Sequence, residues 1–374
     1  MTEVLIFKSL YDIKEEPVLI PAENHELPSG LRYLRCGKRY FPASVSPDGV
    51  IAIITAAAGE ELELIAECDV SSSCDCETCQ SIGLPSELGC AAIDSGKNVT
   101  LMIDGHIFAS YEYSPILPKP HLGPILDNSG NSFTRCDPMN PEHPHQRSLI
   151  VAIGEVNDAD CWNERDNCGF VRSEEICNIV SSSAYAGFTA KNRWTAHDGT
   201  PLMTERTTFT VYNQSEECRT LDMTTTFTAD YGDVVFGPTK EAGPLGIRVR
   251  DEMRADTGCG KLYNSNGQQG EPECWGKTAD WCDYSADIDG IGKMGITIFD
   301  NPTNFQYPTA WHIRAYGLFA ANNFYFKGGF TLSAGDSITY KYRILFRRED
   351  MDSDSINGKF AVYAAHASGL PILK

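Results

Sequence analysis

Two histidines separated by one proline are the residues of this sequence whose types and spacing most directly suggest chemistry. His143 and His145 lie in the stretch "PEHPHQRS", residues 141–148. Pro144 favours extended backbone at His143, and residues two apart on an extended chain point to the same face. Both imidazoles would then face one pocket, as general acid, general base or metal ligand. We favour acid–base chemistry or substrate contact, with a metal site and a purely structural turn as the alternatives.

The metal alternative lacks an evident third ligand. Gln146, Arg147 and Ser148 follow the histidine pair, and Glu155 is the next acid along the chain. The positive charge of Arg147 also opposes a nearby cation. A non-haem site of two histidines and one carboxylate is the form that a metal centre would take. We therefore predict no cofactor and keep a divalent metal as the alternative.

A second histidine motif occurs in "WHIRAYG", residues 311–317. On a strand with period-two alternation, His312 and Arg314 share one face and Trp311 takes the other. Such a strand would present an imidazole and a guanidinium to one site, where the guanidinium binds carboxylates or hydroxyl pairs in a fixed geometry. A structural pair of Arg314 with an acid is the alternative.

Two further stretches carry groups that suit sugars. "CWGKTADW" contains Lys277 and Trp281, an aromatic face beside polar groups, although a tryptophan can equally belong to the core. "GPTKEAG" places Lys240 and Glu241 on a loop rich in glycine and proline. This last pair is either catalytic or a solvated ion pair of small energetic value.

The chain has 14 cysteines, and Cys74, Cys76 and Cys79 form a C-x-C-x-x-C cluster. Thiolates at this spacing can hold zinc. Because no second C-x-x-C stands at zinc-finger spacing, we favour a cysteine-rich surface loop with free thiols. The first residues, "MTEVLIFKSL", show no signal-peptide pattern, so we expect a cytoplasmic protein that keeps its thiols reduced.

Composition narrows the class of partner. The 374 residues carry a formal net charge of −20, which disfavours nucleic acid and anionic membranes because both would be repelled. No apolar run reaches the roughly 18 residues that a membrane helix needs. We expect a small-molecule carbohydrate as the partner, no nucleic acid, no membrane, and leave a homo-oligomer open.

The elements that must position these residues are mostly strands. "SITYKYRILF", "ERTTFTVYN" and "LDMTTTFTAD" alternate apolar and polar residues at period two, which indicates antiparallel sheets. Convincing helices are few, and the best is "DSINGKFAVYAAHA" near the C-terminus. Strands that follow one another without helices predict an all-β fold of two packed antiparallel sheets.

We expect one domain over residues 1–374. It divides into N-terminal strands (1–67), a cysteine-rich insertion (68–98), a core with motif loops (99–348) and a C-terminal helix and tail (349–374). Within the core, residues 114–148 hold seven prolines, so we expect neither helix nor central strand there. Long ordered loops are usually functional. This one would bring His121, His143 and His145 over the rim of a site.

Five motifs, in order, resemble a known family. They are "EHPHQRS", "GEVNDADCW", "FGPTKEAGPLGIRV", "NSNGQQGEPECWGKTADWCDYS" and "IFDNPTNFQYPTAWHIRAYG", and the match runs from about Lys119 to about Phe346. The sequence is thereby similar to the PmoA-like family, labelled "methane oxygenase PmoA". The resemblance implies a β-supersandwich similar to galactose mutarotase and a sugar or glycoside substrate. The chain departs from the family pattern at Glu142, Gln146 and Ser148, where aspartate, a third histidine and glycine are common, which puts catalysis that needs the third histidine in doubt.

The sequence therefore predicts a carbohydrate-active enzyme that acts on a sugar or keto-glycoside by histidine acid–base chemistry, as an epimerase, mutarotase or lyase would. A non-catalytic sugar-binding protein and a histidine-ligated metal enzyme are the alternatives. The predicted catalytic residues are His143, His145 and His312. The predicted substrate-binding residues, from the stretches above and from the resemblance, are Lys119, His121, Arg147, Glu155, Asn157, Trp162, Lys240, Glu241, Arg248, Lys277, Trp281, Asp300, Asn301, Trp311 and Arg314.

Overall fold

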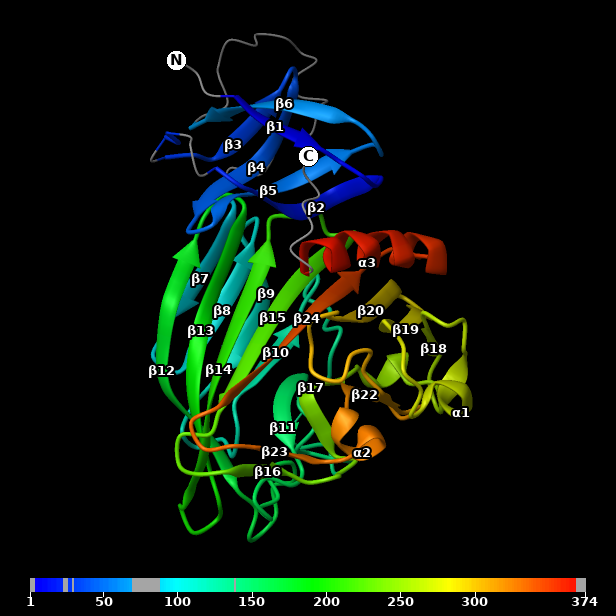
Figure 1. Cartoon of the computed structure of the whole chain (residues 1–374). Coiled ribbons are helices and arrows are strands. Elements are labelled where there is room, and N and C mark those ends of the chain that lie inside the picture. The colour runs from blue at the N-terminus through cyan, green and yellow to red at the C-terminus, as the bar shows by residue number, and fades with distance from the viewer. Residues whose placement is uncertain (1–3, 23–25, 29, 69–87, 138, 368–374) are drawn as a thin grey trace.

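Antiparallel β-sheets make up most of the structure, a computed structural model that describes residues 4–22, 26–28, 30–68, 88–137 and 139–367 (Figure 1). Every strand pair within these ranges is antiparallel. The predicted all-β fold of packed antiparallel sheets with few helices is confirmed. Within the described ranges the helical elements are α1 (Gly270–Cys274), α2 (Asn323–Lys327), α3 (Ser353–Ala367) and the short 3₁₀ helix η2 (Asp251–Met253).

Two eight-stranded sheets form the sandwich. The first, in spatial order, consists of β21 (Trp311–Ile313), β22 (Leu318–Ala321), β17 (Ala242–Arg248), β11 (Leu149–Ile153), β10 (His121–Ile125), β9 (His106–Glu112), β8 (Asn98–Ile103) and β7 (Cys90–Asp94). The second consists of β12 (Phe170–Ser181), β13 (Tyr185–Thr195), β14 (Pro201–Tyr212), β15 (Cys218–Thr228), β24 (Ser337–Arg347), β20 (Gly292–Asp300), β19 (Trp281–Ile288) and β18 (Lys261–Asn264). A two-stranded sheet joins β16 (Val234–Phe236) to β23 (Phe330–Leu332).

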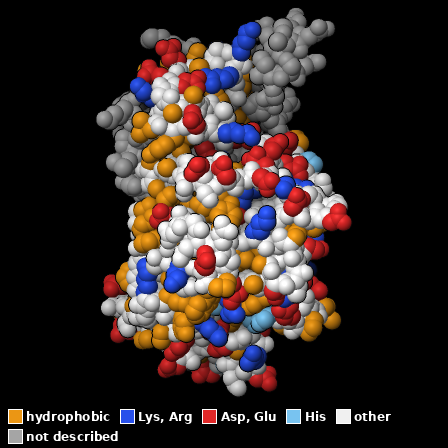
Figure 2. Space-filling view, turned by 90° about the vertical axis from the view of Figure 1, so that its right-hand side faces the viewer, with side chains coloured by type: hydrophobic (Ala, Val, Ile, Leu, Met, Phe, Trp, Pro, Cys, Tyr) orange, Lys and Arg blue, Asp and Glu red, His pale blue; other side chains and the backbone are white. Residues whose placement is uncertain are grey.

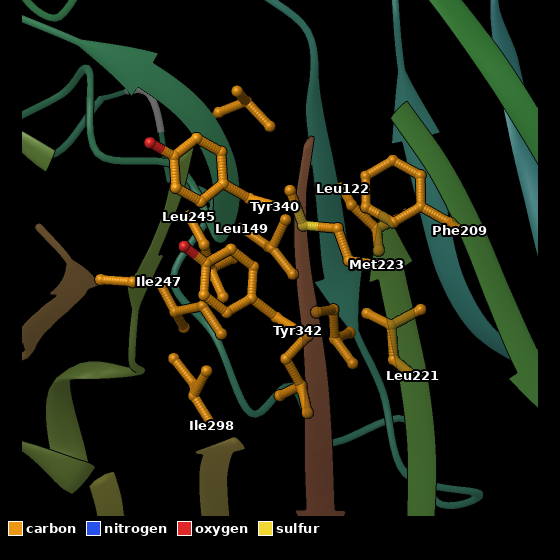
Figure 3. Close-up of a cluster of buried hydrophobic side chains, with 14 of the residues drawn as sticks. Leu122, Leu149, Phe209, Leu221, Met223, Leu245, Ile247, Ile298, Tyr340 and Tyr342 are labelled. Atoms are coloured by element: carbon orange, nitrogen blue, oxygen red, sulfur yellow. The ribbon is translucent and has the colours of Figure 1, made fainter. Parts of the chain in front are cut away.

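The main core lies between these two sheets, where large apolar side chains from both pack together. The predicted alternation of "SITYKYRILF" is confirmed in β24. Every second residue, namely Ile338, Tyr340, Tyr342, Ile344 and Phe346, either belongs to this core or packs against it. Burial of such apolar surface is the main driving force for the fold. Part of the core appears in Figure 3, with labelled residues from the first sheet (Leu122, Leu149, Leu245, Ile247) beside residues from the second (Phe209, Leu221, Met223, Ile298, Tyr340, Tyr342).

A third, six-stranded sheet lies at one end of the sandwich, above β7 and β13 in Figure 1. It has a hydrophobic core of its own, to which Val362 of α3 contributes. The predicted C-terminal helix therefore exists, and it lies against this sheet and the second large sheet. In spatial order the strands are β1 (Val4–Lys8), β6 (Glu61–Glu67), β3 (Tyr33–Cys36), β4 (Arg39–Ser46), β5 (Gly49–Ala56) and β2 (Ile13–Ile20).

The proline-rich segment 114–148 differs from the sequence-based expectation in one respect. It contains β10, an interior strand of the first sheet, between β9 and β11. Pro124 is tolerated there because the register of β10 on β9 shifts between Leu122 and Ile125, so no regular ladder bond is needed at Pro124. Apart from isolated bridges at Leu126, Ser132 and Thr134, the other described residues of the segment are in turns and loops, as expected.

The described helices are all too short or too polar to cross a membrane. Residues 69–87 of the expected cysteine-rich insertion lie outside the described ranges, so the insertion there stays a prediction. Its last residues include β7, which pairs with β8 in the first sheet.

Replacing Arg347 tests a buried ion pair that ties β24 to β19. Arg347 bonds Asp283, both side chains are buried, and Thr297 also donates to the Asp283 carboxylate at 2.5 Å. Arg347→Met leaves this carboxylate buried without its cation, which costs about 3–5 kcal/mol. We expect that loss in the free energy of unfolding from urea denaturation.

Lys191→Met is the matched control, because the pair of Lys191 with Glu175 is exposed. It should cost no more than about 1 kcal/mol. Equal losses in the two variants would contradict the assigned role of the buried pair.

Candidate functional site

The first sheet buries side chains on both of its faces. In β11, Leu149, Val151 and Ile153 join the main core, whereas Ile150 and Ala152 face the opposite way. This follows from the period-two alternation of a strand. The outward face is therefore also covered, and it is the floor on which a cavity is built.

Strands β21 and β22 repeat the alternation beside β11. Phe319 joins the main core, while Leu318 and Ala320 pack with Trp162 on the outward face. In β21, Trp311 is a core residue and His312 lies on the opposite side. The expected separation of Trp311 from His312 is thus present in the structure.

A cavity of about 420 Å³ opens on this outward face. It brings together many of the predicted residues from four distant parts of the chain, namely the loop around 143–146, the loop around 162–165, the loop at 240–241 and the 312–318 hairpin. Its lining consists of His143, His145, Gln146, Trp162, Asn163, Arg165, Lys240, Glu241, His312, Arg314, Tyr316 and Leu318.

His143 reaches the cavity from a turn, so the prediction of extended backbone there is wrong. Its φ is 54°, and the Gln146 backbone N–H donates to the His143 carbonyl at 3.0 Å. Pro144 suits the second position of such a turn. The His143 ring stacks on Tyr316, 5.0 Å between centroids, and stays 40% exposed. Burial, and then the positive charge of Arg248, lower the pKa of His143.

His145 lies deeper. Its ring centroid is 5.9 Å from that of His143 and 5.2 Å from that of Trp162. Burial, followed by the charge of Lys119, lowers the pKa of His145 to about 4. The side chain is therefore a neutral imidazole at pH 7.

His312 has a defined tautomer. The indole N–H of Trp275 donates to His312 Nδ1 at 3.2 Å. An indole nitrogen can only donate, so Nδ1 must be the acceptor and the proton of the neutral ring lies on Nε2. Burial, then Arg314 and Lys240, lower the pKa of His312 to about 4. His312 is thus a neutral hydrogen-bond donor at the cavity, and its catalytic role stays a prediction.

Arg314 and Tyr316 lie in the turn between β21 and β22. Strand β21 ends at Ile313, so it does not reach Arg314 as predicted. Glu271 of α1 holds this turn by accepting from Arg314 Nε at 2.8 Å and from the Ala315 backbone N–H at 2.6 Å. The guanidinium of Arg314 lies 5.2 Å from the Tyr316 ring centroid. A short helix thereby fixes the turn residues that line the cavity.

Lys119 and Arg147 support the site from below instead of lining it. Both bond Glu164, Arg147 through two contacts of 2.7 and 2.6 Å and Lys119 through one of 3.1 Å. Lys119 also donates to the Trp162 carbonyl at 2.7 Å. Burial lowers the pKa of Lys119, whereas for Glu164 the two cations outweigh burial and lower the carboxyl pKa. This buried cluster positions Trp162.

Gln146 and Arg248 form another support. The Gln146 side-chain oxygen accepts from Arg248 Nη1 at 2.8 Å, and Arg248 lies 5.0 Å from the Tyr316 ring centroid. Burial lowers the pKa of Arg248 to about 10. Gln146 stands where the motif commonly has histidine, and its side-chain oxygen provides an acceptor for the buried guanidinium of Arg248. Ser148, where glycine is common in the motif, adopts a φ of 48°, a conformation that glycine adopts readily.

Several predicted residues are core or interior residues. Trp281 does not line the cavity: it is buried under α3 and donates to Asn357 at 2.9 Å. Trp311 is buried in the main core and donates to the Ala279 carbonyl at 2.9 Å. His121 is not brought over the rim, because β10 carries it into a small interior cavity beside Glu205.

Others serve local structure. Burial raises the pKa of Asp300 to about 7, and its carboxylate accepts from the Thr309 backbone at 2.6 Å. Asn301 donates to Tyr363 at 2.9 Å, and Asn157 accepts from the Val235 backbone at 2.6 Å. Glu155 packs against Gly237 and is not part of the cavity lining, and Lys277 is exposed outside it.

The sequence reasoning missed several residues of the site. Three of them, Asn163, Glu164 and Arg165, directly follow Trp162. Their closeness in sequence to this predicted residue is the signal that could have identified them. Tyr316 was within the 311–317 stretch but was not selected. Glu271 carried no signal, because only the fold brings α1 against the β21–β22 turn.

Metal ligands do not gather at the cavity. In the described part of the chain no group of three or more His, Cys, Asp or Glu has the arrangement of a metal site. Cys74, Cys76 and Cys79 lie outside the described residues. The described cysteines are free thiols.

Comparisons with known proteins place the chain in a family without fixing its activity. No curated protein matches it. Among solved structures, a galactose 1-epimerase from Lactobacillus acidophilus is 9% identical over 71% of this chain and all of the epimerase, with a TM-score of 0.32. A polysaccharide lyase is 11% identical over 68% of this chain and 32% of the lyase, with a TM-score of 0.31. Likenesses this weak carry no argument about this chain.

The family comparison is more extensive. The model of DUF6807, a family of unknown function, matches residues 98–361. This span contains every residue of the cavity lining. The description of that family names no activity, so the PmoA-like label stays an expectation. The match covers well over half of this chain, so the chain belongs to the DUF6807 family.

Proposed function

We propose that this protein is a carbohydrate-active enzyme that moves a proton on a sugar or keto-glycoside by histidine chemistry. One observation carries the proposal: three imidazoles, two of them with a pKa of about 4, converge with Lys and Arg side chains on one cavity. Neutral imidazoles accept protons, and adjacent cations stabilise the negative charge that forms on oxygen. Removal of a proton from a carbon next to a carbonyl uses both a neutral imidazole as the base and cations beside the oxygen.

The shape and lining of the cavity suit a sugar. A volume of about 420 Å³ is within the range of small-molecule sites. Trp162 and Tyr316 offer aromatic surface for the C–H faces of a ring, while Asn163, Gln146 and Glu241 offer polar groups for hydroxyls. The resemblance to the PmoA-like family also implies a sugar or glycoside substrate.

His143 is the base in this proposal. It is the more accessible histidine of the 143–145 pair, and its lowered pKa keeps the ring neutral at pH 7. His145, with a pKa of about 4, is a weaker base and contacts the substrate beside Trp162. Stacking on Tyr316 holds the His143 ring in place.

His312 and Arg314 stabilise charge in this proposal. His312 donates from Nε2, because Trp275 occupies Nδ1. Arg314 keeps donors beyond the Nε that bonds Glu271. Together they would bind the oxygen that becomes negative when the neighbouring carbon loses its proton.

Hydrogen–deuterium exchange tests the proton transfer. The purified protein is incubated in D₂O with aldoses, keto-glycosides and uronate glycosides, and loss of C–H signals is followed by proton NMR. We expect exchange at one carbon with the wild type, and a rate at least about 100-fold lower with His143→Gln, since positioned acid–base groups contribute roughly that much.

His106→Gln, at an exposed histidine outside the cavity, should exchange at the wild-type rate. If sugars bind but neither exchange nor product appears with any of them, the protein is a binding module and the proposed reaction is wrong.

The pH dependence of kcat/KM gives a second prediction. The neutral form of His143 is the active one, so activity falls as the pH drops through its pKa. Burial and Arg248 hold that pKa below its ordinary value of 6.5, so the acidic limb should have its midpoint below pH 6.5 and activity should rise to a plateau above it. A midpoint at or above 6.5, or an unchanged acidic limb in the residual activity of His143→Gln, would contradict this assignment.

A further inference from the structure

The lining of the cavity carries an excess of positive charge. Its cations are Arg165, Lys240 and Arg314, and its one carboxylate is Glu241. The histidines add no charge at neutral pH, because burial keeps them neutral. The protein as a whole has a formal net charge of −20, so the sign of this lining is opposite to that of the chain.

Two of these cations have no acidic partner among the residues that the structure describes. Arg314 bonds Glu271, but neither Arg165 nor Lys240 forms an ion pair with any other residue that the structure describes. Glu241 accepts from the Thr239 hydroxyl at 2.7 Å. Lys240 and Arg314 both lie close enough to His312 to lower its pKa. The cavity thus has positive charge left over for a ligand.

This excess is local. On the face shown in Figure 2, acidic and basic side chains are interspersed and form no broad basic surface. A broad basic surface would suit a polyanion such as nucleic acid. Two unpaired cations around a cavity of about 420 Å³ suit a small anion instead.

We infer that the substrate is an anionic sugar whose charge is a carboxylate, such as a uronate or a uronate-containing glycoside, with Arg165 and Lys240 as its counter-ions. The inference rests on the proposed function and specifies its substrate class. A carboxylate is favoured over a phosphate because phosphate sites commonly use helix N-termini or runs of backbone N–H groups. Here the lining residues lie on strands and loops, and none belongs to a described helix.

A carboxylate also fits the chemistry. Removing the proton from the carbon beside a carboxylate places a second negative charge on that group, and nearby cations stabilise it. In an elimination, His143 takes this proton and the C–H electron pair becomes a C=C bond. The C–O bond to the leaving sugar breaks, and its oxygen takes the proton back from His143. The products are an unsaturated uronate and an alcohol, so no co-reactant is needed.

Equilibrium binding tests the inference without requiring turnover. Glucuronate, galacturonate, glucose, galactose and glucose 6-phosphate are titrated into the wild type, and affinities are measured by ligand-observed NMR at low and high salt. We expect a uronate to bind roughly 10-fold tighter than its neutral counterpart, with a preference that shrinks at high salt because ions screen exposed charges.

Variants locate the effect. The double variant Arg165→Met/Lys240→Met should lose the preference for uronates while keeping its affinity for neutral sugars. Lys261→Met, at an exposed position on β18 outside the cavity, should keep the preference. The elimination itself would appear as ultraviolet absorbance of the new conjugated double bond.

The outcomes separate the two proposals. Neutral sugars that bind as tightly as uronates, or a preference that survives in the double variant, would overturn the anionic substrate and leave the proposed function standing. Binding of glucose 6-phosphate without binding of either uronate would overturn the carboxylate. If none of these sugars binds, the proposed function fails, and the inference that rests on it fails too.

Discussion

The site depends on the alternation of side chains along strands that are buried on both faces. In β11, β21 and β22, every second residue belongs to the main core, and Leu149, Phe319 and Trp311 are examples. The intervening residues must face outward, where Ile150 packs in one cluster with Leu318 and Trp162, and the latter two line the cavity. A shift of one residue in any of these strands would exchange the two sets. Core packing therefore determines which side chains the site receives.

Desolvation then sets the chemical state of those side chains. It is the largest cause of the lowered pKa at His143, His145 and His312, and nearby cations add to it. Three of these cations are held in place by acids outside the cavity: Glu164 below it binds Lys119 and Arg147, and Glu271 beside it binds Arg314. The acids neutralise part of the positive charge without entering the lining. What faces the substrate is then a set of neutral imidazoles with residual positive charge.

The chain belongs to a family of unknown function, so its function has to be argued from the site. The cavity lies within the matched residues. Most of its polar groups come from loops and turns, although His312 lies on β21, whereas its floor comes from strands. Rigid strands with functional loops are a common division of labour in proteins. The position of each supporting group matters. At His312, for example, one indole N–H from Trp275 determines which imidazole nitrogen can donate to a ligand.

Sequence alone determined the all-β architecture and many of the residues that meet at the cavity, since period-two patterns and short motifs are local properties. It could not tell Trp162, at the cavity, from Trp281, which packs under α3, because both are aromatic residues beside charged ones. It predicted the wrong backbone at His143 and could not find Glu271, whose partners are more than 40 positions away. Tertiary structure decided these points, because burial and contact depend on packing between distant segments, which no local pattern records.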